Sequence, residues 1–329
     1  MVFELSRRTA LAAALGAGAV LPFCSSAGAQ PTALGAGRLY VTSWFGNAIS
    51  VVDLAKGKAV KTIAVGVHDH NVFLSPDRRT AWVANNNDGT VSIIDTATDE
   101  VSAVLKVGAG PRHTFFSPDG TSAYVTLEFE NAIAEIDPAS RTVRRRLAVG
   151  HMPHFPLVVG NRLFVTNFGG ASVSVIDRSS GAALAHIPVG IGPLGASVTR
   201  DGARVLVACH NSNEVAILDA AALKVEARVS TDAGPVQVSV APDQAFAYVA
   251  NDGASTVQKI DLAKRAVVST IPIGAGAGSH GIAFAPMAGL MFITNTGRAS
   301  VSVIDITRDA IVADIAVGPT PEGVAFLPA

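Results

Sequence analysis

The sequence is poor in cysteine, in aromatic residues and in net charge, and each shortage excludes a class of protein. Only two cysteines occur among 329 residues, which excludes a small scaffold held together by many disulfides. The formal net charge is −1, without a polybasic stretch, so binding to nucleic acid through phosphate contacts is not expected. The sequence contains no G-x-S-x-G, Walker, C-x-x-C-H or H-E-x-x-H motif, so it carries none of these hydrolase, nucleotide, haem or zinc-protease signatures.

The first 29 residues have the pattern of an export signal. Arg7 and Arg8 precede a short apolar run at 9–23, and residues 27–29 (AGA) form a small-residue cleavage site. This pattern predicts a signal peptide that is cleaved near Ala29, a periplasmic location and no membrane span, because the apolar run is too short to cross a bilayer. Residues 6–11 (SRRTAL) also resemble the twin-arginine export motif, and the Sec and twin-arginine routes both stay open. Cleavage would leave Cys209 as the sole thiol, with 23 basic and 25 acidic residues.

A stretch of about 29 residues recurs seven times in the rest of the chain. Its copies start at residues 38, 80, 122, 162, 204, 246 and 290, and the intervals between them are 42, 42, 40, 42, 42 and 44 residues. A period near forty indicates a repeat architecture. After a linker at 30–37, we therefore expect one domain over residues 38–329.

Each repeat predicts four short strands separated by tight turns. In the third copy, residues 112–117 and 122–127 are apolar and extended, residues 132–137 alternate, and residues 143–149 form a fourth strand. Four antiparallel strands in each of seven repeats predict an all-β, seven-bladed β-propeller. The first copy lacks its innermost strand, and residues 322–328 (EGVAFLP) match the innermost strand of the last copy, at 280–286 (HGIAFAP). We therefore expect the C-terminal strand to close the first blade.

Residues 164–167 (FVTN), 248–251 (YVAN) and 292–295 (FITN), each followed by a strand such as VSVID, resemble the YVTN-type β-propeller repeat. The resemblance covers residues 38–329. It implies an exported seven-bladed propeller and leaves the function open, since its relatives include surface proteins of unknown role and, at greater distance, lactonases and quinone- or copper-dependent enzymes.

The strongest functional signal is a cluster of histidines in the loops that lead into the innermost strands. Six of the eight histidines lie there, although nothing in a turn requires histidine. These loops start on the face where the central channel opens. In blade order from the seventh repeat, the first residues of the inner strands are His280, Glu322, His70, Arg112, His154, Leu194 and Val236.

Two kinds of ligand fit this ring of residues. His70, His154, His280 and Glu322 are the candidate ligands of a transition metal, with Zn, Cu or Fe the best matches. Alternatively, Arg112 and His113, with Trp44, Phe45 and Glu128 nearby, hold a small anionic molecule such as a carboxylate or phosphate, or a protein partner. A water-filled polar channel mouth without a specific ligand is the third interpretation.

Two functions follow from these interpretations. The first is a non-catalytic periplasmic binding protein, which the absence of catalytic motifs favours. The second is a metal-dependent enzyme that hydrolyses a lactone-like ester or takes part in redox chemistry. No catalytic residue is identified.

A second ring consists of the residues that end the second strand of each repeat: Ser43, Asn85, Leu127, Asn167, Cys209, Asn251 and Asn295. We expect the asparagines to cap the following turn and Cys209 to be a small buried hydrophobic residue rather than a metal ligand. The repeated aspartate of the VSVID strand, for example Asp95, is expected to form an Asx turn.

Overall fold

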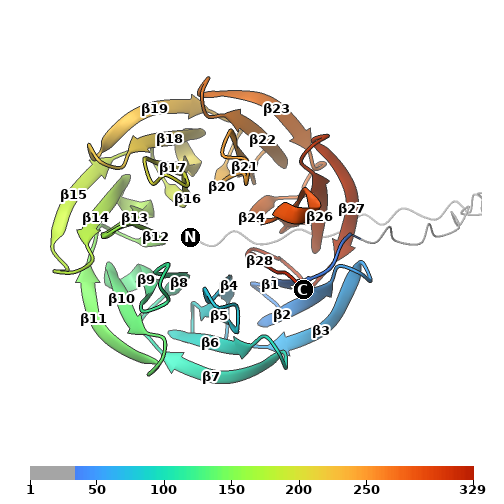
Figure 1. Cartoon of the computed structure of the whole chain (residues 1–329), viewed down its shortest axis with the longest axis horizontal. Helices are drawn as coiled ribbons and strands as arrows, with labels where there is room; N and C mark the ends of the chain where they lie inside the picture. Colours follow the sequence, from blue (N-terminus) through green and yellow to red (C-terminus); the bar gives the residue numbers. More distant parts are fainter. Residues whose placement is uncertain (1–33) are drawn as a thin grey trace, which may run out of the picture.

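The computed structural model describes residues 34–329, which form a closed ring of seven four-stranded antiparallel sheets around a central channel (Figure 1). This confirms the predicted all-β, seven-bladed propeller with four strands in each blade. The predicted signal peptide at 1–29 lies outside the described residues. Among residues 34–329, no helix has the length and apolar character needed to cross a membrane.

The strands of each blade run from the channel to the rim in a regular order. The innermost strands are β28 (Val324–Leu327), β4 (Asp69–Leu74), β8 (Pro111–Phe116), β12 (Pro153–Val159), β16 (Pro193–Val198), β20 (Pro235–Val240) and β24 (Ser279–Ala285). The second strands are β1 (Arg38–Val41), β5 (Thr80–Asn85), β9 (Ala123–Leu127), β13 (Arg162–Asn167), β17 (Arg204–Cys209), β21 (Phe246–Asn251) and β25 (Leu290–Asn295).

The third and fourth strands complete each sheet toward solvent. The third strands are β2 (Ala48–Asp53), β6 (Thr90–Asp95), β10 (Ala132–Asp137), β14 (Ser172–Asp177), β18 (Glu214–Asp219), β22 (Thr256–Asp261) and β26 (Ser300–Asp305). The outer strands are β3 (Lys58–Ala64), β7 (Glu100–Lys106), β11 (Thr142–Ala148), β15 (Ala183–Pro188), β19 (Lys224–Ser230), β23 (Ala266–Pro272) and β27 (Ala310–Ala316). Four short 3₁₀ helices lie in the connecting loops: η1 (Glu128–Glu130), η2 (Phe168–Gly170), η3 (His210–Ser212) and η4 (Pro286–Ala288).

Burial along the strands explains their composition. The second strands are covered on both faces by the neighbouring blades, so β25 is buried throughout and reads as a continuous apolar run. The outer strands alternate, and β7 exposes every second side chain to solvent. The turns that follow the third strands use the repeated aspartate as expected: Asp95 Oδ1 accepts the backbone N–H groups of Ala97 and Thr98 at 2.8 and 3.1 Å.

The ring is closed by the two ends of the described chain. β28 pairs antiparallel with β1, with Val41 opposite Val324 and Arg38 opposite Leu327. The first blade is therefore β28-β1-β2-β3, as the incomplete first repeat predicts. This pairing covers the inner edge of β1 and makes β28 the innermost strand of the first blade, as β4, β8, β12, β16, β20 and β24 are in the other six blades.

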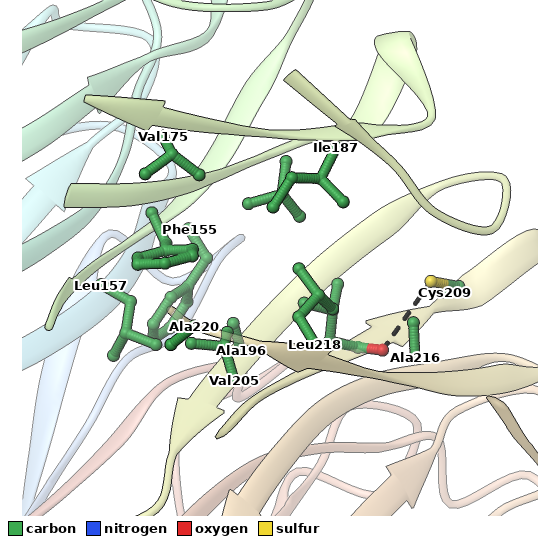
Figure 2. Close-up of a cluster of buried hydrophobic side chains, with 13 residues drawn as sticks. Phe155, Leu157, Val175, Ile187, Ala196, Val205, Cys209, Ala216, Leu218 and Ala220 are labelled. Carbon is green, nitrogen blue, oxygen red and sulfur yellow. Dashed lines mark hydrogen bonds between the residues drawn. The ribbon is translucent and has the colours of Figure 1, made fainter. Parts of the chain in front are cut away.

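The hydrophobic core lies between adjacent blades. Figure 2 shows the cluster between the blade of β12 and the blade of β16, where Phe155, Val175 and Ile187 pack toward Val205 and Cys209. Cys209 has no exposed surface, and burial raises the pKa of its thiol to about 11. A thiol in this environment is a small core side chain, as expected, and stays protonated at neutral pH.

Candidate functional site

A β-bulge near the start of six of the seven inner strands changes the direction of the side chains next to it; β28 pairs with β1 without a register shift. In β8, Pro111 pairs with Leu127 and Thr114 pairs with Val125, so Arg112 and His113 together oppose Thr126. The same kind of register shift occurs in β4, β12, β16, β20 and β24. A bulge re-aims the side chains next to it, so the strict in-and-out alternation of a strand does not hold here.

The bulges bring three histidines of consecutive blades together. The imidazole rings of His70 and His113 lie 4.8 Å apart between centroids, those of His113 and His154 lie 4.6 Å apart, and those of His70 and His154 lie 5.3 Å apart. Each ring can offer one nitrogen so that the three nitrogens lie within 4.8 Å of one another. All three side chains are buried, with exposed fractions of 2, 2 and 7%. We call these residues the histidine cluster.

The histidine cluster contains polar atoms that the fold leaves unsatisfied. His70 Nδ1, both ring nitrogens of His113 and His154 Nδ1 are buried without a hydrogen-bond partner among the described residues. An unpaired buried donor or acceptor costs about 1–3 kcal/mol, so native proteins rarely contain several in one place. Three such imidazoles side by side indicate that a ligand supplies the missing interactions.

The electrostatics of the cluster favour neutral imidazoles. Burial lowers the pKa of His70, His113 and His154 well below the usual value of 6.5, and the nearby Arg112 guanidinium lowers these pKa values further. His280, whose ring lies 6.3 Å from that of His70, has a pKa lowered by burial to about 4. The neutral imidazole is the form that binds metal ions, so no proton has to be removed first at neutral pH.

Two carboxyl groups lie beside the cluster. Glu322 Oε2 lies 3.5 Å from His70 Nε2, and burial raises the pKa of Glu322 to about 8. Asp69, directly before His70, accepts the backbone N–H of Ser43 at 2.6 Å, and burial raises its pKa to about 7. Asp69 Oδ1 and Glu322 Oε2 have no hydrogen-bond partner among the described residues. A cation near these groups would favour their charged forms.

Arg112 forms a partly buried ion pair at the edge of the cluster. Its Nε and Nη2 donate to the two carboxylate oxygens of Glu128 at 2.6 and 3.1 Å. The guanidinium also lies over the Trp44 ring, 5.4 Å from its centroid, and Trp44 in turn stacks on His68 at 4.7 Å. This arrangement fixes the guanidinium in one orientation at the channel mouth.

Threonines of the second strands hold the backbone of the site. Thr126 Oγ1 accepts the backbone N–H of His113 at 3.1 Å and donates to the backbone carbonyl of His154 in the next blade at 2.8 Å. Thr42 links the carbonyl of His70 to the N–H of Gly323 in the same way, at 3.2 and 2.7 Å. The threonine of the repeat therefore connects neighbouring blades at the level of the histidines.

The channel is divided into two chambers. The upper chamber has a volume of about 330 Å³, and the residues that line it include Arg112, Glu128, Glu322 and the histidines His70, His154 and His280, but not His113. The lower chamber, of about 420 Å³, contains no ionisable side chain in its lining. Between the two, the Phe155 ring packs 4.8 Å from that of His113, and Phe73 and Phe115 pack against Phe155. The ionisable groups therefore face one opening of the channel.

Comparison with known proteins gives a family. A family model described as YNCE-like beta-propeller matches residues 5–328. The chain belongs to the YNCE-like β-propeller family. No curated protein matches it.

Three solved structures illustrate how widely this fold is shared. A protein of unknown function from Desulfotomaculum acetoxidans is 16% identical, with a TM-score of 0.79, and the match covers 89% of this chain and 99% of that one. Hydrazine synthase of Kuenenia stuttgartiensis is 17% identical with a TM-score of 0.73, covering 79% and 95%. Dihydro-heme d1 dehydrogenase NirN, in complex with DHE, is 15% identical with a TM-score of 0.68, covering 93% and 77%. At these identities the likeness concerns the fold alone.

The residues expected at the channel do converge there, but their grouping differs from the expected one. His70 and His154 belong to the histidine cluster, whereas the third member is His113, which the sequence pattern assigned to ligand binding beside Arg112. Glu322 and His280 lie next to the cluster. The physical reason is the bulge in β8, which brings His113 to the channel together with Arg112.

The other expected residues lie around the mouth. Trp44 and Glu128 contact Arg112, while Phe45 is 66% exposed on the rim. The asparagines of the second ring make different contacts from those expected. Asn85 Nδ2 donates to the side chains of Thr90 and Ser92, both at 2.9 Å, so it ties two strands together through their side chains.

Two further residues of the site were not found from the sequence. Asp69 is the first residue of its inner strand, whereas four other inner strands begin with proline. This difference from the other repeats could have identified Asp69 from the sequence. His210 lies in η3 at the lip of the upper chamber. His210 follows the second strand of its blade, whereas the pattern found in the sequence concerned only histidines in the loops before the innermost strands.

Proposed function

We propose that this protein binds one first-row transition metal ion at the mouth of its channel, through His70, His113 and His154. The observation that carries the proposal is the set of three buried imidazoles from adjacent blades. One nitrogen of each ring can lie within 4.8 Å of the others, and each ring has at least one nitrogen without a hydrogen-bond partner among the described residues. Imidazole nitrogens suit Zn²⁺, Cu²⁺ and Fe²⁺.

The distances in the cluster are compatible with this role after a small adjustment. In a tetrahedral zinc site with bonds of about 2.0–2.1 Å, neighbouring ligand atoms are about 3.4 Å apart. The imidazoles would therefore move inward by roughly an ångström, which rotation about their side-chain bonds can supply. Glu322, 3.5 Å from His70, is near enough to become a further ligand or to hydrogen-bond a metal-bound water.

Metal titration of the purified protein tests the proposal. Isothermal calorimetry with Zn²⁺, Cu²⁺ and Co²⁺, together with elemental analysis after dialysis, should give one ion per chain. His70→Ala, His113→Ala and His154→Ala should each weaken binding at least about tenfold, because each removes a ligand. His186→Ala is the matched control, since His186 lies in the outer strand β15. Equal affinity in the control and the three cluster variants would refute the proposal.

Export belongs to the same proposal. The pattern of residues 1–29 supports a periplasmic protein, and a binding role without catalysis agrees with the lack of catalytic motifs. Cell fractionation tests the location: the chain should accumulate in the periplasm, and replacing Arg7 and Arg8 by glutamine should keep it in the cytoplasm.

A second function is supported by the number of ligands. Three protein ligands are typical of catalytic zinc sites, in which water or substrate takes the fourth position. The upper chamber gives such a position access to solvent, and the Glu322 carboxyl beside it could exchange a proton with a bound water. Hydrolysis of lactone-like esters by the zinc-loaded protein is the test, and activity that persists in His113→Ala would exclude this site as its source.

A further inference from the structure

The upper chamber places two groups that bind anions near each other. Three protein ligands leave the fourth position of a tetrahedral metal ion open to a further ligand. Arg112 lines the same chamber, and its guanidinium uses only Nε and Nη2 in its ion pair with Glu128. The ionised carboxyl groups of Glu322 and Asp69 can balance the charge of a divalent ion, so the open position and the free guanidinium nitrogen are what indicate a second component of the bound state.

We infer that the upper chamber binds a short-chain monocarboxylate, with its carboxylate between the metal ion and Arg112 and its alkyl end against Leu194. This inference rests on the proposed metal site. It joins the two kinds of ligand that the sequence left as alternatives, because His70, His154 and Arg112 all line the same chamber.

The guanidinium of Arg112 is held in place and has an unused nitrogen with which it can bind an anion. Its ion pair with Glu128 uses Nε and Nη2, and Nη1 makes no hydrogen bond or ion pair with the rest of residues 34–329. The guanidinium is kept in place by Glu128 and by Trp44, so little side-chain entropy is lost when a ligand binds. A planar guanidinium with free N–H groups is suited to carboxylate oxygens.

The chamber sets the size and polarity of the ligand. A volume of about 330 Å³ is at the lower end for a small-molecule site. Leu194 occupies the inner-strand position at which the three preceding blades have histidine or arginine. Together with Met152 and Phe168 it forms the apolar part of the chamber lining. Below, the phenylalanines between the chambers limit the depth. These limits favour acetate, propionate or butyrate over larger or multiply charged anions.

The experiment uses cobalt as a spectroscopic probe in the full-length protein. Co²⁺ is bound first, and its visible absorption bands report changes in the metal's ligands. Sodium acetate, propionate and butyrate are then titrated at constant ionic strength in a non-coordinating salt. We expect saturable spectral changes, with butyrate binding more tightly than acetate because more apolar surface is buried.

Two variants that replace a charged side chain by a neutral amide give opposite expected results. Arg112→Gln should weaken carboxylate binding about tenfold, the usual value of a charged hydrogen bond. Glu128→Gln should strengthen binding, because the Arg112 charge is then uncompensated. A general disturbance of the fold would weaken binding in both variants, so the opposite signs separate recognition from damage. Each variant is first checked for one cobalt ion per chain.

Other outcomes overturn the inference. If cobalt binds at the histidines but the spectrum does not respond to the carboxylates, or if Arg112→Gln binds them as tightly as the wild-type protein, the carboxylate site is refuted and the metal site stands. If cobalt does not bind at the histidines, both the proposed function and this inference fail.

Discussion

The polar ring of His113 suits ligand binding but lowers the stability of the ligand-free fold. Its side chain is 2% exposed and both ring nitrogens lack partners among residues 34–329. One of these nitrogens carries a proton and therefore needs an acceptor. Phe155 packs against the ring, so an apolar side chain would suit the position better in the metal-free protein.

Replacing His113 with leucine should therefore stabilise the metal-free protein. Removing the unpaired polar atoms should gain about 1 kcal/mol, which raises the melting temperature by roughly 2 °C in a protein of this size. Added Zn²⁺ should raise the melting temperature of the wild-type protein further and have less effect on the variant. Differential scanning calorimetry with and without Zn²⁺ measures both effects.

The matched control is His186→Leu, because His186 lies on the exposed outer strand β15. It should leave the response to Zn²⁺ unchanged. A strongly destabilised metal-free His113→Leu protein would show that His113 serves the fold and not a ligand.

At the level of elements, the bulge and the threonine opposite it form one unit that presents the histidines. Thr126 lies opposite Arg112 and His113 and bonds to the backbone of His113 and His154. It does not touch the ring nitrogens, so it acts by positioning. Supporting hydrogen bonds of this kind typically change metal affinity by a factor of about 10–100.

Thr126→Val should weaken metal binding about tenfold by removing both hydrogen bonds at constant side-chain volume. Thr126→Ser keeps the hydroxyl and should restore the affinity. Thr294→Val breaks the same kind of link elsewhere, between Gly281 and Glu322, and should change affinity less because it touches none of the three histidines. Calorimetric titration with Zn²⁺ compares the three, and equal losses in Thr126→Val and Thr126→Ser would contradict the positioning role.

The strands and their bulges also show which features could be predicted from the sequence. The strands and their order followed from the repeat, because each strand must bury its apolar face against a neighbouring blade. The ring of His70, Arg112 and His154 followed from aligning the repeats. The sequence placed His113 beside Arg112 as a ligand-binding residue, but its place in the histidine cluster did not follow. Aligning the repeats selects only one inner-strand residue of each blade, and the bulge brings His113 to the channel in addition to Arg112.

For the whole molecule, the important feature is that seven similar blades produce an asymmetric channel mouth. The ring positions carry ionisable side chains in five consecutive blades, whereas Leu194 and Val236 occupy the remaining two. The closed ring brings residues from both ends of the chain together, so that Glu322 reaches His70. The upper chamber is thus lined mainly by ionisable side chains, with Leu194, Met152 and Phe168 as its apolar part.

The buried titratable groups predict how the stability of the metal-free protein depends on pH. The pKa values of His70, His113 and His154 are lowered from 6.5, so below about pH 6.5 the unfolded chain binds protons that the folded chain does not, and stability falls. The pKa of Glu322 is raised from 4.5 to about 8, so stability also falls as the pH rises from 4.5 to 8. Asp69, whose pKa is raised from 3.8 to about 7, adds to this decrease, and above pH 6.5 only the effect of the two carboxyl groups remains.

The melting temperature of the metal-free protein should therefore be highest near pH 6.5. His113→Leu should reduce the decrease on the acid side, and Glu322→Gln should reduce the decrease between pH 6.5 and 8. Calorimetric scans from pH 4.5 to 8.5 measure these slopes. A melting temperature that rises steadily up to pH 8 would show that Glu322 is ionised in the folded, metal-free protein.

The central claim concerns the position of a metal ion, and anomalous diffraction locates it directly. Crystals of the zinc-loaded protein, measured on both sides of the zinc absorption edge, should show one strong anomalous peak bonded to nitrogens of His70, His113 and His154. A peak at other residues, or no peak in protein shown by elemental analysis to contain zinc, would contradict the account.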